Sequence, residues 1–360
     1  MLSKFPPNLD SACGNTMNQP SKSDWATLHQ AAITFKEAVP WNWVDNEGIL
    51  AVENPDDGEV GYCSILGSGG EEFGLGMFMG EEGYGRYTKL VTGEAEPEDI
   101  EESIMARSIS MLLVDRDVLQ KEDREVIRSL GLRFRGRNAW PFFRSQRPGY
   151  VAWFLEKEEV LFLNTAIHQA LIVVDEVRSG KLDLSAGDAE NLVLTRCYRG
   201  GDWVEEWRRA PPTSSQSRET HAENIDPVKQ AELYLLRSRT SRASGTWELD
   251  IFILPIGIGP ASTRRYFPMC FLVVERKLGL IIDSKITEPW LTLSQKQDEV
   301  IQILRKANQL PLEIRVKSDK VRGIVEPITR ILDIKCRVGS LPMMEQAKAS
   351  LYEDFSGRFA

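Results

Sequence analysis

Two spacings of apolar residues alternate along the chain and predict helices and strands in turn. Apolar positions three and four residues apart indicate amphipathic helices, and short alternating or continuous apolar runs indicate strands. In the first half the predicted ranges are 23–40, 49–53, 60–66, 73–79, 81–91, 108–114, 121–130 and 156–178, with short aromatic-rich strands before the last helix. After its opening helix, this half is expected to form three strands followed by alternating helices and strands.

The second half follows nearly the same order. Its predicted ranges are a helix at 226–238, strands at 246–255, 266–275 and 279–284, and then alternating helices and strands at 294–307, 312–317, 319–332, 334–338 and 343–355. We therefore expect an α+β or mixed α/β fold with two modules. Each module should hold a mixed β-sheet in βββ-α-β-α-β-α order, flanked by helices.

Composition suggests where the modules begin and end. Residues 210–224 are rich in Pro, Ser and Thr and have almost nothing to bury, which is typical of a linker. Residues 1–22 are polar and interrupted by proline, so we expect a disordered tail without a secretory signal. The predicted modules are residues 23–209 and 225–360. No apolar run stands out as long enough to span a membrane, and we expect a cytoplasmic protein.

Charge is unevenly distributed along the chain. Residues 45–102 contain sixteen acidic side chains and two basic ones, while the whole chain has a net charge of −9. This balance argues against a strongly basic polyanion binder. We expect the arginines of residues 133–147 to pair with the acidic stretch inside the first module.

Cysteines and histidines give no sign of a metal site. Five cysteines are scattered without a CxxC pair, which predicts reduced, mostly buried thiols. The three histidines are not spaced for a shared zinc ion. His168 lies one position from the apolar stripe of its predicted helix, and we interpret it as an ordinary helix residue. The glycine-rich stretch 61–85 lacks the lysine of a phosphate-binding loop and is interpreted as strand turns.

One segment of the first module combines guanidinium and aromatic groups. Residues 133–150 contain five arginines and no acid, and the candidate ligand-binding residues are Arg133, Arg135, Arg137, Trp140 and Phe142. Such side chains can stack on nucleobases and contact phosphate. The alternative is a half-buried strand whose arginines form ion pairs within the module. Nucleotide or nucleic-acid binding is therefore an open but not preferred function.

The second module resembles the ribonuclease H-like fold of integrase cores in its element order. The run Trp247-Glu248-Leu249-Asp250 resembles the first strand of such a core, and PLEIRVKSD at 311–319 resembles the fourth strand leading to a second acid. The resemblance implies catalytic, metal-binding roles for Asp250, Asp319 and Glu345. These carboxylates would converge on Mg²⁺ or Mn²⁺ to cleave or transfer a phosphodiester.

Each of the three acids also has a structural interpretation. Asp319 and Glu345 fall in the first turns of predicted helices, where carboxylates are favoured. Asp250 alternates with apolar neighbours, so it is expected to face solvent. The spacing from Asp319 to Glu345 is shorter than in integrase cores, and the Asp-Asn-Gly that follows their fourth strand is absent. If the fold is ribonuclease H-like, the strand with Asp250 must be central and lie beside residues 312–317.

Taken whole, the chain resembles an uncharacterised bacterial two-module family. The resemblance is in VENPDDGEVGYCSILGSGGEEFGL in the first half, and in TWELDIFILP and RYFPMCFLVVE in the second. This family implies no activity. The preferred interpretation is a cytoplasmic bacterial accessory or binding protein without a demonstrable catalytic centre. Its cofactor, ligand and partners are unknown, apart from Mg²⁺ under the nuclease alternative.

Overall fold

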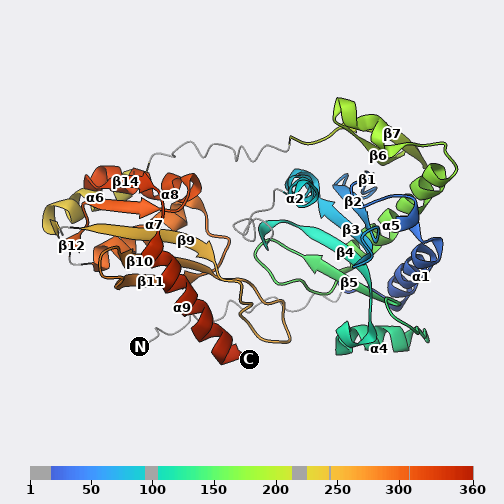
Figure 1. Cartoon of the computed structure of the whole chain (residues 1–360), viewed down its shortest axis with the longest axis horizontal. Helices are drawn as coiled ribbons and strands as arrows, with labels where there is room; N and C mark the ends of the chain where they lie inside the picture. Colours follow the sequence, from blue (N-terminus) through green and yellow to red (C-terminus); the bar gives the residue numbers. More distant parts are fainter. Residues whose placement is uncertain (1–17, 94–103, 213–224, 243–244, 308, 360) are drawn as a thin grey trace. The chain divides into compact units, whose positions relative to one another are not determined.

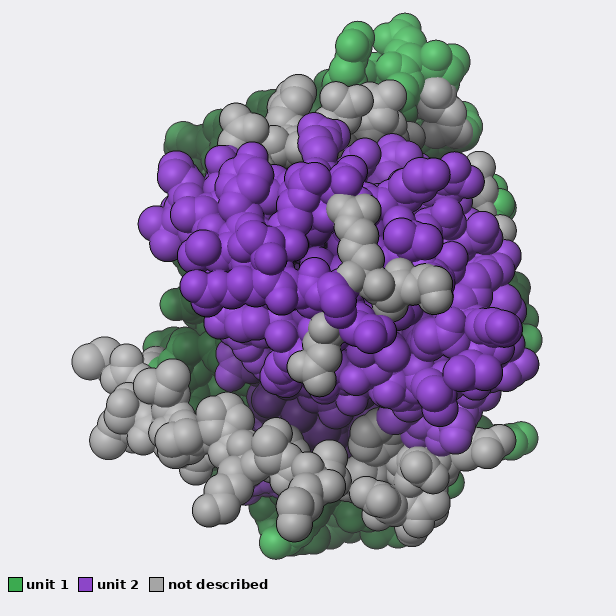
Figure 2. All heavy atoms as spheres, turned by 90° about the vertical axis from the view of Figure 1, so that its left-hand side faces the viewer, with its two compact units in different colours: residues 1–97, 106–147, 152–213 green, residues 98–105, 148–151, 214–360 purple. Residues whose placement is uncertain are grey.

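The chain forms two compact units (Figure 2). Each unit has mixed α/β structure (Figure 1). The computed structural model describes residues 18–93, 104–212, 225–242, 245–307 and 309–359. Residues 1–97, 106–147 and 152–213 make up unit 1, and residues 98–105, 148–151 and 214–360 make up unit 2. Most of the expected tail and linker lies outside the described residues. The predicted fold class, two mixed sheets flanked by helices, is confirmed.

Unit 1 is built on a seven-stranded sheet. In spatial order its strands are β5 (Trp140–Gln146), β4 (Ser108–Val114), β3 (Phe73–Met79), β2 (Val60–Leu66), β1 (Ile49–Glu53), β6 (Leu192–Arg199) and β7 (Asp202–Arg209). Strands β1 to β5 form an antiparallel meander, β6 pairs parallel to β1, and β7 returns antiparallel to β6. The carboxyl ends of β1 and β6 therefore lie side by side.

Helices cover both faces of this sheet (Figure 1). Helices α1 (Lys22–Ala38) and α5 (Lys157–Arg178) pack on one face, and α2 (Gly80–Thr92) packs on the other. A further helix, α4 (Lys121–Ser129), lies between β4 and β5 in sequence. Helix α1 begins with a capping box formed by Ser21 and Asp24, and it ends at Val39, which is in the left-handed region before Pro40.

Helix α5 is the longest apolar helix of the described chain. By length and composition alone it would suffice to cross a membrane. Half of its apolar window is buried, however, and Val160, Leu163 and Ile167 belong to the core of unit 1. The core helix of a folded module meets the same criterion, because burial in protein and in lipid select similar residues.

The hairpin β6–β7 is absent from the sequence-based elements. Its turn is Gly200-Gly201, and both glycines have positive φ, at 58° and 103°. A two-residue glycine turn between alternating strands is a strong hairpin signal, since each central residue needs a conformation that side chains disfavour. The short strands expected before α5 are likewise one continuous strand, β5.

Unit 2 has a five-stranded sheet in the order β11-β10-β9-β13-β14. The strands are β11 (Ile281–Thr287), β10 (Met269–Glu275), β9 (Thr246–Ile253), β13 (Glu313–Val316) and β14 (Lys335–Val338), and a separate short pair joins β8 (Ser241–Arg242) to β12 (Gln309–Leu310). Strand β9, which carries Asp250, is central and pairs parallel to β13. The strand position expected for Asp250 is confirmed.

The two faces of β9 belong to different cores. Trp247, Leu249 and Ile251 pack with helices α6 (Pro227–Arg239), α7 (Leu293–Lys306) and α8 (Asp319–Leu332). On the opposite face, Phe252 packs with α9 (Pro342–Phe359). This strand order differs from the meander of unit 1, so the shared element order does not make the two modules copies of one fold.

Gly74 lies where the backbones of β3 and β4 approach closely. Replacing it tests the pairing of these two strands. It has φ of 156°, and an added Cβ would lie 2.1 Å from the backbone oxygen of Met111. Gly74→Ala should therefore destabilise unit 1 by about 1–3 kcal/mol or more, because backbone has to shift. Thermal unfolding followed by circular dichroism measures the effect.

The matched control is Gly69→Ala, since an added Cβ at Gly69 has nothing within 4 Å. It should change stability by less than about 0.5 kcal/mol. Equal losses in the two variants would contradict the strand pairing described above.

Candidate functional site

Strand β9 places two carboxylates inside unit 2. The side chain of Glu248 is fully buried, and Asp250 is only 3% exposed. The expectation that Asp250 faces solvent is therefore wrong. Alternation does separate Asp250 from the apolar residues of the α6–α8 core, but α9 covers the face on which Glu248, Asp250 and Phe252 lie.

Lys348 of α9 neutralises Asp250. Its Nζ donates a hydrogen bond to Asp250 Oδ2 at 2.6 Å and lies 4.2 Å from the centroid of the Phe252 ring. The side chains of Lys348 and Asp250 are 14% and 5% exposed. A buried carboxylate costs much free energy unless it is paired, and the ammonium group supplies that pair.

Glu248 accepts hydrogen bonds from two other groups, Arg276 and the backbone of Met344. Arg276 Nη1 donates to Glu248 Oε1 at 2.7 Å, and the same atom donates to the backbone oxygen of Ser340 at 2.9 Å. The backbone N–H of Met344 donates to Glu248 Oε2 at 2.7 Å. Met344 is in the first turn of α9, where unpaired N–H groups and the helix dipole favour a negative charge. Glu248 therefore anchors the start of α9.

The other two predicted catalytic acids lie at helix starts. Asp319 is exposed in the first turn of α8 and contacts Arg322 at 2.9 Å. Glu345 is exposed in the first turn of α9 and lies 3.6 Å from Lys317. Across the described ranges, no group of three or more His, Cys, Asp or Glu side chains could hold a metal ion. The proposed catalytic role of Asp250, Asp319 and Glu345 stays a prediction, and the contacts described for each are ion pairs and helix-start positions.

The arginine and aromatic segment divides into an exposed and a buried part. Arg133, Arg135 and Arg137 are exposed, and Arg137 lies 3.9 Å from Asp115. Trp140 packs against Phe134 with ring centroids 5.6 Å apart.

Phe142 is half-buried and lies next to the buried residues Phe143 and Arg144. The guanidinium of Arg144 is 3.8 Å from the centroid of the Phe142 ring and also forms a two-point ion pair with Asp123. Its contact with Arg144 gives Phe142 a structural role inside the module. The role of the five candidate residues in binding stays a prediction.

The expected pairing between this segment and the acidic stretch 45–102 is wrong for the residues that the structure describes. Arg144 pairs with Asp123, and Arg147 pairs with Glu156 and Glu159. Within the described part of the acidic stretch, Glu59 pairs with Arg107. Local neighbours in the sheet, rather than opposite net charges of two segments, decide which groups meet.

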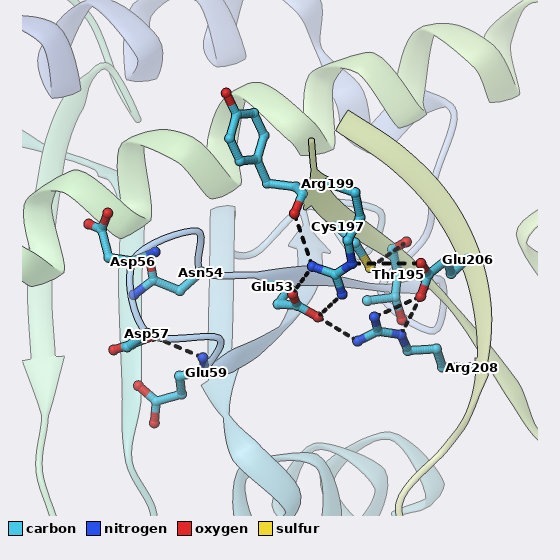
Figure 3. Close-up of polar contacts among 11 residues, drawn as sticks. Glu53, Asn54, Asp56, Asp57, Glu59, Thr195, Cys197, Arg199, Glu206 and Arg208 are labelled. Atoms are coloured by element: carbon cyan, nitrogen blue, oxygen red, sulfur yellow. Dashed lines mark hydrogen bonds and ion pairs between the residues drawn. The ribbon is translucent and has the colours of Figure 1, made fainter. Parts of the chain in front are cut away.

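Glu53 is the centre of an ion-pair network at the carboxyl ends of β1 and β6 (Figure 3). Its two carboxylate oxygens accept from Arg199, and Oε2 also accepts from Arg208 Nη1 at 2.7 Å. Arg208 in turn donates to Glu206 through Nε and Nη2, at 2.9 and 2.7 Å. Hydrogen bonds from Arg199, and then from Arg208, lower the pKa of Glu53 to about 2. Two acids and two bases balance, so this network has no spare charge for a ligand.

Cys197 lies beside this network without the properties of a nucleophile. It is fully buried, and burial raises the pKa of its thiol to about 11. A thiol with a raised pKa is protonated near neutral pH and therefore unreactive. The network joins strands β1, β6 and β7 and is structural.

A pocket of about 430 Å³ lies between α5 and the β6–β7 hairpin of unit 1. Its lining residues are Pro55, Asn164, Thr165, His168, Gln169, Tyr198 and Trp203. The polar residues of α5 are spaced 164/168 and 165/169, so they share one helix face across two turns. The lining residues include no Lys, Arg, Asp or Glu.

Sequence reasoning missed this pocket although two of its signals are in the sequence. The first is a polar stripe on a helix that is otherwise apolar, and the second is the glycine turn of the β6–β7 hairpin, which brings Tyr198 opposite Trp203. His168, which the sequence predicts to be an ordinary helix residue, is exposed and lines the pocket.

Removing Lys348 tests the buried pair in unit 2. Lys348→Ala should destabilise unit 2 by about 3–5 kcal/mol, because Asp250 would stay buried without a cation. The combined replacement Asp250→Leu with Lys348→Met should recover most of this loss, since neither buried charge remains. Denaturant unfolding of Asp250→Leu, Lys348→Met and the double variant measures the coupling between the two side chains. Additive losses would show that the two groups do not interact.

The pH dependence of stability tests the Glu53 network. The pKa of Glu53 is lowered in the folded chain, so its stabilisation is present above the unfolded pKa of about 4.5 and is lost as pH falls toward about 2. Glu53→Gln should flatten the fall in stability in this window. The control Glu71→Gln, at an exposed glutamate of the β2–β3 turn, should leave the wild-type profile unchanged. Indistinguishable profiles for the wild type and Glu53→Gln would refute the pairing.

The comparisons with known proteins agree with a two-module chain and assign no activity. No curated protein matches the sequence. A solved structure, the catalytic core domain of BIV integrase, matches with a TM-score of 0.24 and 16% identity, over 32% of this chain and 69% of that chain. A TM-score this low does not establish a shared fold. Residues 25–196 match a domain of unknown function (DUF7309), and residues 232–352 match a second domain of unknown function (DUF6930). Two such domains agree with a two-module organisation.

Proposed function

We propose that the chain is a cytoplasmic bacterial binding protein without a catalytic centre, whose second module is a ribonuclease H-like scaffold. Support for the scaffold is the strand order, with β9 central and parallel to β13. The cytoplasm is a reducing compartment. The four described cysteines are all free, which supports this location.

The observation that carries the non-catalytic assignment is the contact of Lys348 with Asp250. A metal-dependent nuclease needs the first-strand carboxylate to bind Mg²⁺ or Mn²⁺ with oxygens from other acids. Here Asp250 Oδ2 accepts from an ammonium group at 2.6 Å, and α9 covers the strand face. These residues do not fit a divalent cation, because a bound ion and the ammonium would compete for the same carboxylate and repel each other.

The alternative is a metal-dependent nuclease or transposase-like relic. It shares the strand order of the preferred function but needs Asp250, Asp319 and Glu345 to act together. The exposed Asp319 and Glu345, each beside a cation of its own, weigh against that requirement.

A cleavage assay separates the two functions. Single- and double-stranded DNA and RNA are incubated with the full chain and Mg²⁺ or Mn²⁺. We expect no cleavage beyond that of Asp250→Asn, because a paired, covered Asp250 has no role in chemistry. Cleavage that needs the metal and disappears in Asp250→Asn would overturn the proposed function.

A further inference from the structure

The pocket between α5 and the β6–β7 hairpin has the chemistry of a binding site for a flat, uncharged ligand. At about 430 Å³ it lies within the range of small-molecule sites. No Lys, Arg, Asp or Glu lines it. This lining favours a neutral group over a phosphate or an ammonium group, since no Lys, Arg, Asp or Glu supplies a counter-charge.

The hairpin supplies an aromatic wall. Tyr198 and Trp203 are cross-strand partners, and their ring centroids are 5.5 Å apart at an angle of 57°. Tyr198 is 42% exposed although it is a large aromatic residue on a paired strand. An exposed ring beside a pocket offers a surface on which a planar ligand can stack, as nucleobases do on aromatic side chains.

Helix α5 supplies the polar wall, and Asn164 is its most informative member. Asn164 Oδ1 is buried and has no hydrogen-bond partner in the structure. A buried acceptor without a donor costs free energy, so unsatisfied groups of this kind are rare in folded proteins. Because this oxygen is inaccessible to solvent, a ligand N–H group reaches it only when the Asn164 amide turns toward the pocket, and the new hydrogen bond would then remove this cost.

Gln169 supplies hydrogen-bond donors, in contrast to the acceptor of Asn164. Its Oε1 accepts from Arg196 Nε at 3.0 Å, so toward a ligand the amide can act through its N–H donors. Thr165 donates to the backbone oxygen of Leu161 at 3.1 Å and can then only accept. The helix wall thus offers both a carbonyl acceptor and amide donors beside an aromatic surface.

We propose that this pocket binds a planar nitrogen heterocycle of the nucleobase class, whose edge carries both an N–H donor and a C=O acceptor. The N–H donates to Asn164, the C=O accepts from Gln169, and the ring stacks on Tyr198. The inference rests on the binding role proposed above and gives that role a ligand class. Carbohydrates also stack on aromatic residues and are the competing class.

The test uses the full chain with uridine and inosine as probes, by saturation-transfer NMR and isothermal titration calorimetry. We expect one or both nucleosides to bind. Asn164→Leu should weaken binding at least about tenfold through loss of the acceptor, and Tyr198→Ala should do so through loss of stacking. N3-methyluridine, which lacks the N–H donor, should bind more weakly than uridine. Tyr234→Ala, at an exposed tyrosine of α6, is the matched control and should leave binding unchanged.

Three results would overturn this inference: no binding of either nucleoside, binding that is insensitive to Asn164→Leu and Tyr198→Ala, or binding of maltose in place of the nucleosides. Circular dichroism of each variant establishes that it folds, and methylated uridine tests the donor without any mutation. None of these results bears on the cleavage assay. Metal-dependent cleavage would defeat the non-catalytic function while leaving the pocket test unaffected.

Discussion

The ion pair between Lys348 and Asp250 is the constraint on which the second module depends. Strand β9 is the central strand of its sheet, and a carboxylate at its middle is buried at a large cost unless a cation reaches it. Helix α9 brings that cation, and the hydrogen bond from Met344 to Glu248 fixes where the helix begins. One helix thus completes the apolar core on its side of the sheet and donates a hydrogen bond to each acid of β9, with Arg276 pairing Glu248 as well.

The first module depends in a similar way on the parallel pairing of β1 and β6. This pairing brings Glu53 and Arg199 together at the carboxyl ends of the two strands. There an ion-pair network with Arg208 and Glu206 joins β1, β6 and β7 (Figure 3). The same β6–β7 hairpin presents Tyr198 and Trp203 to α5. The network is internally neutral, whereas the pocket has a buried acceptor that lacks a donor. A ligand can therefore add a favourable hydrogen bond in the pocket, whereas the groups of the network are already paired.

Local patterns predicted most elements but not the environment of the acids. The range of α8 follows from apolar spacing, and the central position of β9 was implied by the resemblance to the ribonuclease H-like element order. The burial of Asp250 does not, because it depends on Lys348, which is 98 residues further along the chain. Alternation indicates which face a residue occupies, and only the tertiary fold decides whether that face is covered. The partners of Arg144 and Arg147 were mispredicted for the same reason, since segment charge does not specify neighbours in a sheet.

The most direct test of the central claim is a crystal structure grown in the presence of Mn²⁺, with anomalous scattering used to locate the ion. Our account predicts Lys348 Nζ within hydrogen-bonding distance of Asp250 and no manganese peak at that carboxylate. A manganese ion bound by Asp250 together with Asp319 and Glu345, with Lys348 displaced, would contradict it and establish the second module as a metal site.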